Sequence, residues 1–224
     1  MSRASRSRRA CASGPPRPAL LEAARPGDLL VVGTHGHRPV ARVLLGSTST
    51  SLVTHAHQPV LVVRSGPLTQ DAPVVVGVDG STSSVAAVLA AAAEADRAGV
   101  ALRAVAAVPS YARTCWASPQ PPTPRRKEAA AFVSEALAGL HEQYPDLVVE
   151  QVISRAHPVE ALVRASRQAR LLVVGNRGLG TFQSLLLGSV SREVVQRAES
   201  SVLVVRAHRL PVTPQRTHAS VANA

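Results

Sequence analysis

The chain is poor in aromatic residues, in lysine and in long apolar runs. Aromatic side chains make up 2% of the 224 residues, so a hydrophobic core must be built from aliphatic side chains. The longest apolar run, at 85–93, is well short of the ~20 residues that span a bilayer. The two cysteines, Cys11 and Cys115, fit no metal-binding spacing. These shortages predict a cytoplasmic protein with no membrane partner.

The net charge of +11 could indicate a nucleic-acid partner, so its distribution matters. Residues 1–70 carry nine arginines against two acids, whereas residues 71–210 carry 15 basic and 12 acidic residues. Lys127 is the single lysine beside 24 arginines, which is more typical of GC-rich coding than of a basic binding face. Surfaces that bind nucleic acids often combine such a face with stacking aromatic side chains, and these are nearly absent here. We therefore expect no nucleic-acid partner.

A 37-residue segment occurs twice in the chain, with an offset of 142 positions. The first copy (28–64) and the second copy (170–206) align without a gap and are identical at 18 positions. Each contains Gly-x2-Gly, nine residues and Gly-Ser; these are Gly33, Gly36, Gly46 and Ser47 in the first copy, and Gly175, Gly178, Gly188 and Ser189 in the second. A repeat at a domain-sized period fixes the architecture, and 224 residues hold about one and a half such units.

Strand and helix patterns alternate through residues 71–210. Short apolar runs predict strands at 73–79, 100–108, 147–153, 171–174 and 202–205. Helical spacing predicts helices at 81–98, 127–144, 158–168 and 189–198. The proline-rich segment at 109–126 is predicted to be a loop. Ser83 is the expected N-cap of the first of these helices and Gly99 its expected end. This alternation predicts a parallel sheet covered by helices on both faces.

The segment from Gly175 to Ser191 has the arrangement of a phosphate-binding loop, because glycines follow a strand and precede a helix. Gly175 and Gly178 lack Cβ atoms, so backbone N–H groups can approach phosphate oxygens there. Gly188 permits the turn into the helix, where Ser189 and Ser191 can cap it or donate to phosphate. Arg177 adds a charged contact. Asp79 ends the first strand at the same edge of the sheet, where ligands of such folds bind.

Other motifs do not match. The loop lacks the Lys-Ser/Thr of a Walker A motif, has the wrong order for GxGxxG, and no GxSxG elbow is present. His35, His37, His55 and His57 have no metal-ligand counterparts in the second copy, and we interpret them as surface polar residues. No pair of side chains resembles a general acid and base. The sequence therefore predicts neither a metal site nor a dedicated enzyme.

Three segments resemble the universal stress protein family. These are VVVGVDGS at 74–81, ALRAVAAV at 101–108, and LLVVGNRG…GSVS across 171–191. The resemblance implies an α/β fold with an open, doubly wound, parallel five-stranded sheet, Rossmann-like and similar to the adenine nucleotide alpha-hydrolases. It also implies ATP as ligand, with Mg²⁺, and a regulatory role in the stress response. By the same resemblance Gly77, Asp79 and Val105 would surround adenine and ribose, and Gly175, Gly178, Gly188, Ser189, Val190 and Ser191 would hold the phosphates.

The repeat and the resemblance divide the chain into four parts. We expect a disordered basic arm at 1–13, a partial universal stress protein domain at 14–66, a complete one at 71–210 and a disordered tail at 211–224. The partial domain resembles only the last third of the unit, as in a tandem member that has lost its front. Its strand at 29–32 would be an unpaired edge. Members of the family often pair their fifth strands, so we expect a homodimer or an intrachain pseudo-dimer through these strands.

Two other functions stay open. Asp79 with Mg²⁺ could support slow nucleotide hydrolysis or phosphoryl transfer. Alternatively, the chain could be a dimerisation module whose glycine loop binds no nucleotide.

Overall fold

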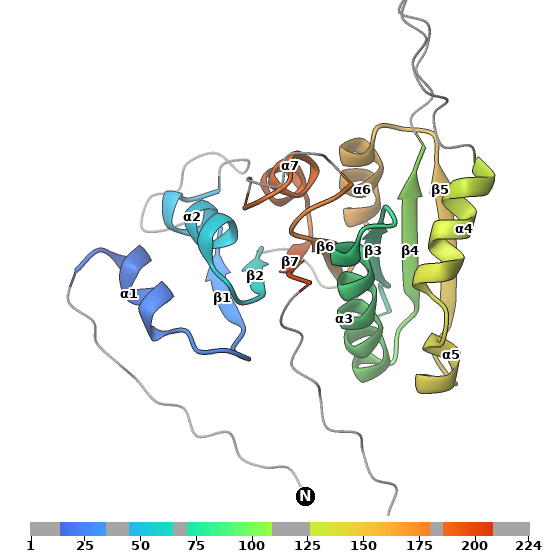
Figure 1. Ribbon diagram of the computed structural model, residues 1–224, viewed down its shortest axis with the longest axis horizontal. Coiled ribbons are helices and arrows are strands. Elements are labelled where there is room, and N and C mark those ends of the chain that lie inside the picture. Colours follow the sequence, from blue (N-terminus) through green and yellow to red (C-terminus); the bar gives the residue numbers. More distant parts are fainter. Residues whose placement is uncertain (1–13, 35–44, 65–70, 109–125, 180–185, 208–224) are drawn as a thin grey trace, which may run out of the picture.

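A computed structural model describes residues 14–34, 45–64, 71–108, 126–179 and 186–207 of the chain (Figure 1). The predicted arm, the predicted tail and nearly all of the predicted 109–126 loop lie outside these residues. The strands are β1 (Leu30–Gly33), β2 (Val60–Val63), β3 (Val74–Val78), β4 (Leu102–Ala107), β5 (Val149–Ser154), β6 (Leu171–Gly175) and β7 (Ser201–Val205). The helices are α1 (Pro16–Ala23), α2 (Ser47–His55), α3 (Thr82–Ala98), α4 (Arg126–Ala136), α5 (Leu140–Gln143), α6 (Pro158–Ser166) and α7 (Ser189–Arg197).

All of these strands form one sheet in the order β1-β2-β7-β6-β3-β4-β5. The five strands from β7 to β5 are parallel to one another, with Val74 of β3 in register with Leu102 of β4 and Leu171 of β6. The chain moves from β3 outward to β5 and then returns to β6 on the other side of β3. The predicted α/β fold with a doubly wound, parallel five-stranded sheet is confirmed.

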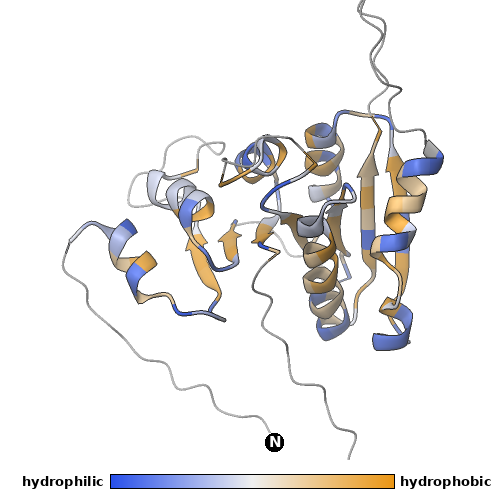
Figure 2. Ribbon diagram, in the orientation of Figure 1, coloured by the Kyte–Doolittle hydropathy of each residue, from blue (hydrophilic) through white to orange (hydrophobic). Residues whose placement is uncertain are grey.

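Aliphatic side chains fill both faces of the sheet. One core lies under α3, α4 and α5, and the other under α2, α6 and α7. On α3 the contact surface consists largely of fully buried alanines, including Ala87, Ala91 and Ala95, which let the helix approach the sheet closely. The central strands β3, β6 and β7 are hydrophobic along their length, as expected for strands buried on both faces (Figure 2). No helix of the described residues is long and apolar enough to cross a membrane.

Two helix predictions were wrong in detail. The N-cap of α3 is Ser81 rather than Ser83, and its hydroxyl accepts a hydrogen bond from the backbone N–H of Ser84 at 3.2 Å. The predicted helix at 127–144 is interrupted, because α4 ends at Ala136 and Gly139 has a φ of 77° before α5 begins. Gly99 ends α3 in the left-handed conformation with a φ of 65°, as predicted.

The N-terminal segment, residues 14–64, joins the sheet through its last strand. β2 pairs with β7 in antiparallel register, with Val60 opposite Val204 and Val62 opposite Val202. β1 pairs only with β2 among the described strands and forms one edge of the sheet. The chain thus contains the predicted intrachain pairing of the two equivalent last strands.

Two equivalent arginines make reciprocal contacts across this junction. Nη2 of Arg64, which follows β2, donates to the carbonyl oxygens of Val195 and Gln196 in α7, at 2.7 and 2.9 Å. Nη2 of Arg206, which follows β7, donates to those of Val53 and Thr54 in α2, at 2.9 and 3.2 Å. In each case the donor and both acceptors differ from their counterparts by the repeat offset of 142 positions. A guanidinium at a helix C-terminus satisfies carbonyls that lack intrahelical partners and opposes the negative end of the helix dipole.

Candidate functional site

A cavity of about 1180 Å³ lies at the carboxyl ends of β3, β4, β6 and β7. This is the edge at which open α/β sheets bind their ligands. The structure brings all ten residues that the sequence singled out into its wall: Gly77, Asp79, Val105, Gly175, Arg177, Gly178, Gly188, Ser189, Val190 and Ser191. One side of the wall is apolar, with Val105, Leu162 and Val174, and the other carries the glycine loop between β6 and α7.

The glycine loop is closed by two hydrogen bonds. The N–H of Gly188, the N-cap of α7, donates to the carbonyl oxygen of Asn176 at 2.7 Å, and the buried hydroxyl of Ser191 donates to that of Gly175 at 2.6 Å. The first copy repeats both bonds: Gly46 donates to Thr34 at 2.8 Å and Ser49 to Gly33 at 2.7 Å. In this structure the hydroxyl proton of Ser191 is therefore used within the loop.

The start of α7 presents anion-binding groups to the cavity. Its first intrahelical bond runs from the N–H of Arg192 to the carbonyl oxygen of Gly188, at 3.0 Å. The N–H groups of Ser189 and Val190 have no intrahelical acceptor, as in any first helical turn, and both residues line the cavity. Ser189 is exposed, so its hydroxyl can also face a ligand. These groups and the helix dipole favour a negative charge at this point.

Asp79 is held against the loop by neighbours on α3. Its Oδ1 accepts hydrogen bonds from the backbone N–H of Ser81 at 3.0 Å and from its hydroxyl at 2.6 Å. Its Oδ2 faces Gly178, where a Cβ atom would lie only 2.5 Å from it. The carboxylate is exposed, so the groups that fix its orientation leave it accessible from the cavity.

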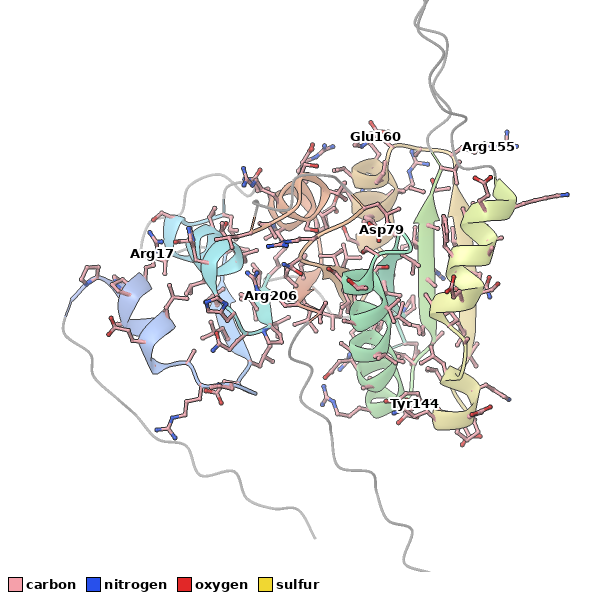
Figure 3. The ribbon with its side chains drawn as sticks, in the orientation of Figure 1. Arg17, Asp79, Tyr144, Arg155, Glu160 and Arg206 are labelled. Carbon is pink, nitrogen blue, oxygen red and sulfur yellow. The ribbon has the colours of Figure 1, made fainter. Side chains whose placement is uncertain are left out.

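The opposite part of the cavity is positively charged. Arg177, Arg206 and His57 line it, and Asp79 is the only acid among the described lining residues. Partial burial lowers the pKa of Arg206, and the charge of Arg177 lowers it further. Figure 3 shows Arg206 between α2 and the rest of the molecule, at a distance from Asp79 at the end of β3. Cationic groups at this end and apolar ones under β3 and β4 fit a ligand with one anionic and one apolar part.

Comparison with known proteins identifies the family. A sequence model described as the universal stress protein family matches residues 4–64 and 72–206. The chain belongs to the universal stress protein family. A universal stress protein of Mycolicibacterium smegmatis is 41% identical over 196 residues, which cover 84% of this chain and 64% of that protein. One from Mycobacterium tuberculosis is 38% identical over 193 residues and is covered to 65%. The chain thus spans slightly less than two thirds of the length of these relatives.

Solved structures of universal stress proteins share the fold. One from Archaeoglobus fulgidus is 22% identical with a TM-score of 0.54, and the match covers 80% of this chain and 60% of that chain. One from Pseudomonas aeruginosa is 20% identical with the same TM-score, and the match covers 80% and 63%. A universal stress protein in complex with cAMP is 31% identical with a TM-score of 0.46 over 61% of this chain and 98% of that chain.

Sequence reasoning missed several polar residues of this universal stress protein's cavity, among them His57, Ser81, Asn176 and Arg206. Arg206 is identical in both copies of the repeat, and this signal could have drawn attention to it. His57 had no such signal, because the equivalent residue in the second copy is Glu199. His57 and His55 are both exposed, as predicted, but only His57 lines the cavity. His35 and His37 lie outside the described residues.

The described residues contain no group of three or more His, Cys, Asp or Glu side chains that could hold a metal ion. A divalent cation in this cavity would therefore have to be coordinated largely by the ligand and by water, with Asp79 the nearest protein carboxylate.

Proposed function

We propose that this universal stress protein binds ATP, with Mg²⁺, in the cavity and acts as a nucleotide-dependent regulator in the stress response. The main support for this proposal is that the glycine loop, the start of α7 and Asp79 all line one cavity. Adenine would lie against Gly77 and Val105, and Asp79 would accept hydrogen bonds from the ribose. The phosphates would lie on the loop, close to Gly175, Gly178, Gly188, Ser189, Val190, Ser191 and Arg177.

The residues present fit this ligand. An aliphatic wall can hold a flat base, since Gly77 leaves room beside Leu162 and Val174 where a Cβ atom would lie 3.1 Å from Leu162 Cδ1. The α7 N–H groups, Arg177 and Arg206 supply hydrogen bonds and positive charge for phosphates. Mg²⁺ would arrive with the phosphates, since it keeps several waters and needs few protein carboxylates.

The proposal is for binding rather than for turnover. Asp79 is the only acid among the described lining residues, and its Oδ1 already accepts two hydrogen bonds from Ser81. Phosphoryl transfer normally uses a positioned base or a water-orienting group. Phosphate release measured with and without Mg²⁺ checks this point. Turnover that requires both Mg²⁺ and Asp79 would favour the alternative of a slow hydrolase or phosphotransferase.

We also propose that the sheet unites two family domains in tandem. Residues 71–210 would form a complete domain and residues 14–66 would correspond to the last third of a second one. The gapless repeat, the two hydrogen bonds that close each loop and the reciprocal arginine contacts support this division. The junction of β2 with β7 would then be an intrachain pseudo-dimer of fifth strands.

Nucleotide retention and thermal stability test the function. Native mass spectrometry of the purified protein should detect an adenine nucleotide. Added ATP and Mg²⁺ should raise the melting temperature, with a stabilisation of ~2.7 kcal/mol at about 100 times the dissociation constant. The control is Asp79→Asn, which keeps the size of the side chain and should reduce the shift. If the protein retains no nucleotide and millimolar ATP leaves its melting temperature unchanged, the loop is a dimerisation element without a ligand.

A further inference from the structure

The cavity ends at the junction between the N-terminal segment and the rest of the sheet. Because β2 is antiparallel to β7, the start of β2 lies beside the end of β7. His57 precedes β2 by three residues and Arg206 directly follows β7, so both reach the carboxyl edge of the parallel strands. Both line the cavity, and among the described residues of the N-terminal segment only His57 does so.

Arg206 is fixed in place by α2 and by the glycine loop. Its Nη2 donates to the carbonyl oxygens of Val53 and Thr54, and its Nη1 donates to that of Leu186 at 3.3 Å. A guanidinium has five N–H groups, so these bonds to described residues leave two for a ligand. His57 is exposed, and an imidazole can donate at least one N–H in either protonation state. Arg206 is therefore set in position before any ligand arrives.

Charge makes this end selective for an anion. Arg177 and Arg206 both line this end, and the charge of Arg177 adds to burial in lowering the pKa of Arg206, while Asp79 lies at the end of β3. Neighbouring strands are about 4.8 Å apart, so β3 and β7, with β6 between them, are about 10 Å apart. A phosphate chain that leaves the start of α7 in the direction of β7 would meet Arg206 and His57 beyond the first phosphate.

We propose that the N-terminal segment completes the nucleotide site, and that His57 and the α2-anchored Arg206, with Arg177, bind the terminal phosphates of a nucleoside polyphosphate. The protein would thus distinguish ATP from AMP through residues at the junction of the two copies. This inference rests on the proposed function and adds to it the ligand class and the residues that set it.

The chain offers a matched control for each residue. Arg64 makes the same contacts on the other side of the junction but does not line the cavity. Arg64→Gln and Arg206→Gln therefore remove equivalent contacts with helix carbonyls, and the second also removes the bond to Leu186 and a donor to the ligand. His55 is an exposed histidine two residues from His57 that contacts Ser51 and lies outside the cavity wall.

The test measures the affinities of the full-length protein for ATP, ADP and AMP by calorimetry, in the presence of Mg²⁺. Wild type should bind ATP more tightly than AMP. Arg206→Gln should lower the affinity for ATP on the order of tenfold, as for a lost hydrogen bond between charged groups, and change that for AMP less than about twofold. His57→Gln should also lower the affinity for ATP. Arg64→Gln and His55→Gln should keep the wild-type ratio of ATP affinity to AMP affinity.

Four results would overturn the inference. Equal wild-type affinities for ATP and AMP would leave the proposed function standing but remove the terminal-phosphate site. A uniform loss for all nucleotides in both arginine variants would mean that Arg206 acts only through the fold. Unchanged ATP affinity in both His57→Gln and Arg206→Gln would exclude a contact from the junction. If wild type binds no adenine nucleotide at all, the proposed function fails and the inference fails with it.

Discussion

Gly175 and Gly178 belong to one loop, yet their surroundings require glycine for different reasons. A Cβ atom on Gly175 would lie 2.7 Å from Cβ of Ser83 and 2.8 Å from its carbonyl carbon, which belong to the rigid start of α3. A Cβ atom on Gly178 would lie 2.5 Å from Oδ2 of Asp79, an exposed side-chain atom that can shift at the cost of the hydrogen bonds from Ser81. A substitution at Gly175 therefore strains the packing of β6 against α3, whereas one at Gly178 changes the cavity.

We expect Gly175→Ala to lower the free energy of unfolding by about 1–3 kcal/mol, the usual cost of an extra methyl group in a packed interior. The backbone of α3 cannot give way as a flexible side chain would. Urea denaturation measures the change. A loss under about 0.5 kcal/mol would show that β6 and α3 separate easily, and the close approach would then be no constraint.

Gly178→Val should show the reverse pattern. Its branched side chain would displace the Asp79 carboxylate and cover the backbone N–H groups of the loop, while the aliphatic cores stay intact. The free energy of unfolding should stay within about 1 kcal/mol of wild type, and ATP affinity should fall at least about tenfold, which corresponds to ~1.4 kcal/mol of binding free energy. Denaturation and calorimetry on the same preparation check both. Wild-type affinity for ATP would mean that Gly178 is only a turn residue.

The lining residues found from the sequence share one property: each stands at the carboxyl end of a parallel strand or at the helix start that follows it. That placement follows from local patterns, because in a parallel sheet these ends meet at one edge. His57 could not be found in this way. It precedes its strand, and it reaches the same edge only because β2 runs antiparallel to β7.

At the scale of elements, the start of α3 connects folding with the site. Ser81 caps the helix through Ser84 and also donates to Asp79 at 2.6 Å. Residues 81–84 read Ser-Thr-Ser-Ser, so four hydroxyls compete for the cap and the sequence cannot select among them. The break between α4 and α5 was equally hidden, because helical spacing of apolar residues continues through Gly139 even though its backbone is left-handed.

Ser81→Ala should destabilise the protein by about 1 kcal/mol, a typical value for the loss of an N-cap. It should also weaken ATP binding, because Asp79 loses the hydroxyl that orients it. Ser83→Ala is the control: Ser83 is buried, and alanine keeps its Cβ contact with Gly175. Thermal denaturation and calorimetry of both variants test whether Ser81 is the N-cap of α3 and whether it orients Asp79. Equal losses in stability would contradict the cap at Ser81.

For the whole molecule, the repeat predicted that the two last strands would pair, and β2 and β7 do so. The reciprocal contacts of Arg64 and Arg206 follow the same pseudo-symmetry. The sequence shows that both copies end in arginine, but it does not predict which carbonyl groups these side chains contact. Reciprocal contacts of equivalent residues are the mark of an isologous interface. The junction therefore supports the proposed pseudo-dimer within a single chain.

Removal of residues 1–70 tests the division of the chain. The remainder keeps the five parallel strands and the helices α3 to α7, so we expect it to fold. It loses the buried side chains of Leu52, Val53 and Val62, and the apolar strand β7 becomes an edge of the sheet. An exposed apolar edge strand favours pairing with another chain. Light scattering during size-exclusion chromatography should therefore detect a homodimer through β7, while circular dichroism should retain the α/β signature.

The same deletion should separate the two parts of the nucleotide site. The glycine loop, Asp79 and the apolar wall all lie within residues 71–210, so AMP should bind as it does to the full chain. Arg206 loses its carbonyl partners on α2 and His57 is absent, so the preference for ATP should fall toward that of Arg206→Gln. In the homodimer, β7 would pair with β7, and no second copy of residue 57 would be available to replace the lost donor. A deleted chain that folds and binds ATP as tightly as the full chain would show that the cavity is complete without the N-terminal segment; one that cannot fold would show that residues 71–210 are not a domain by themselves.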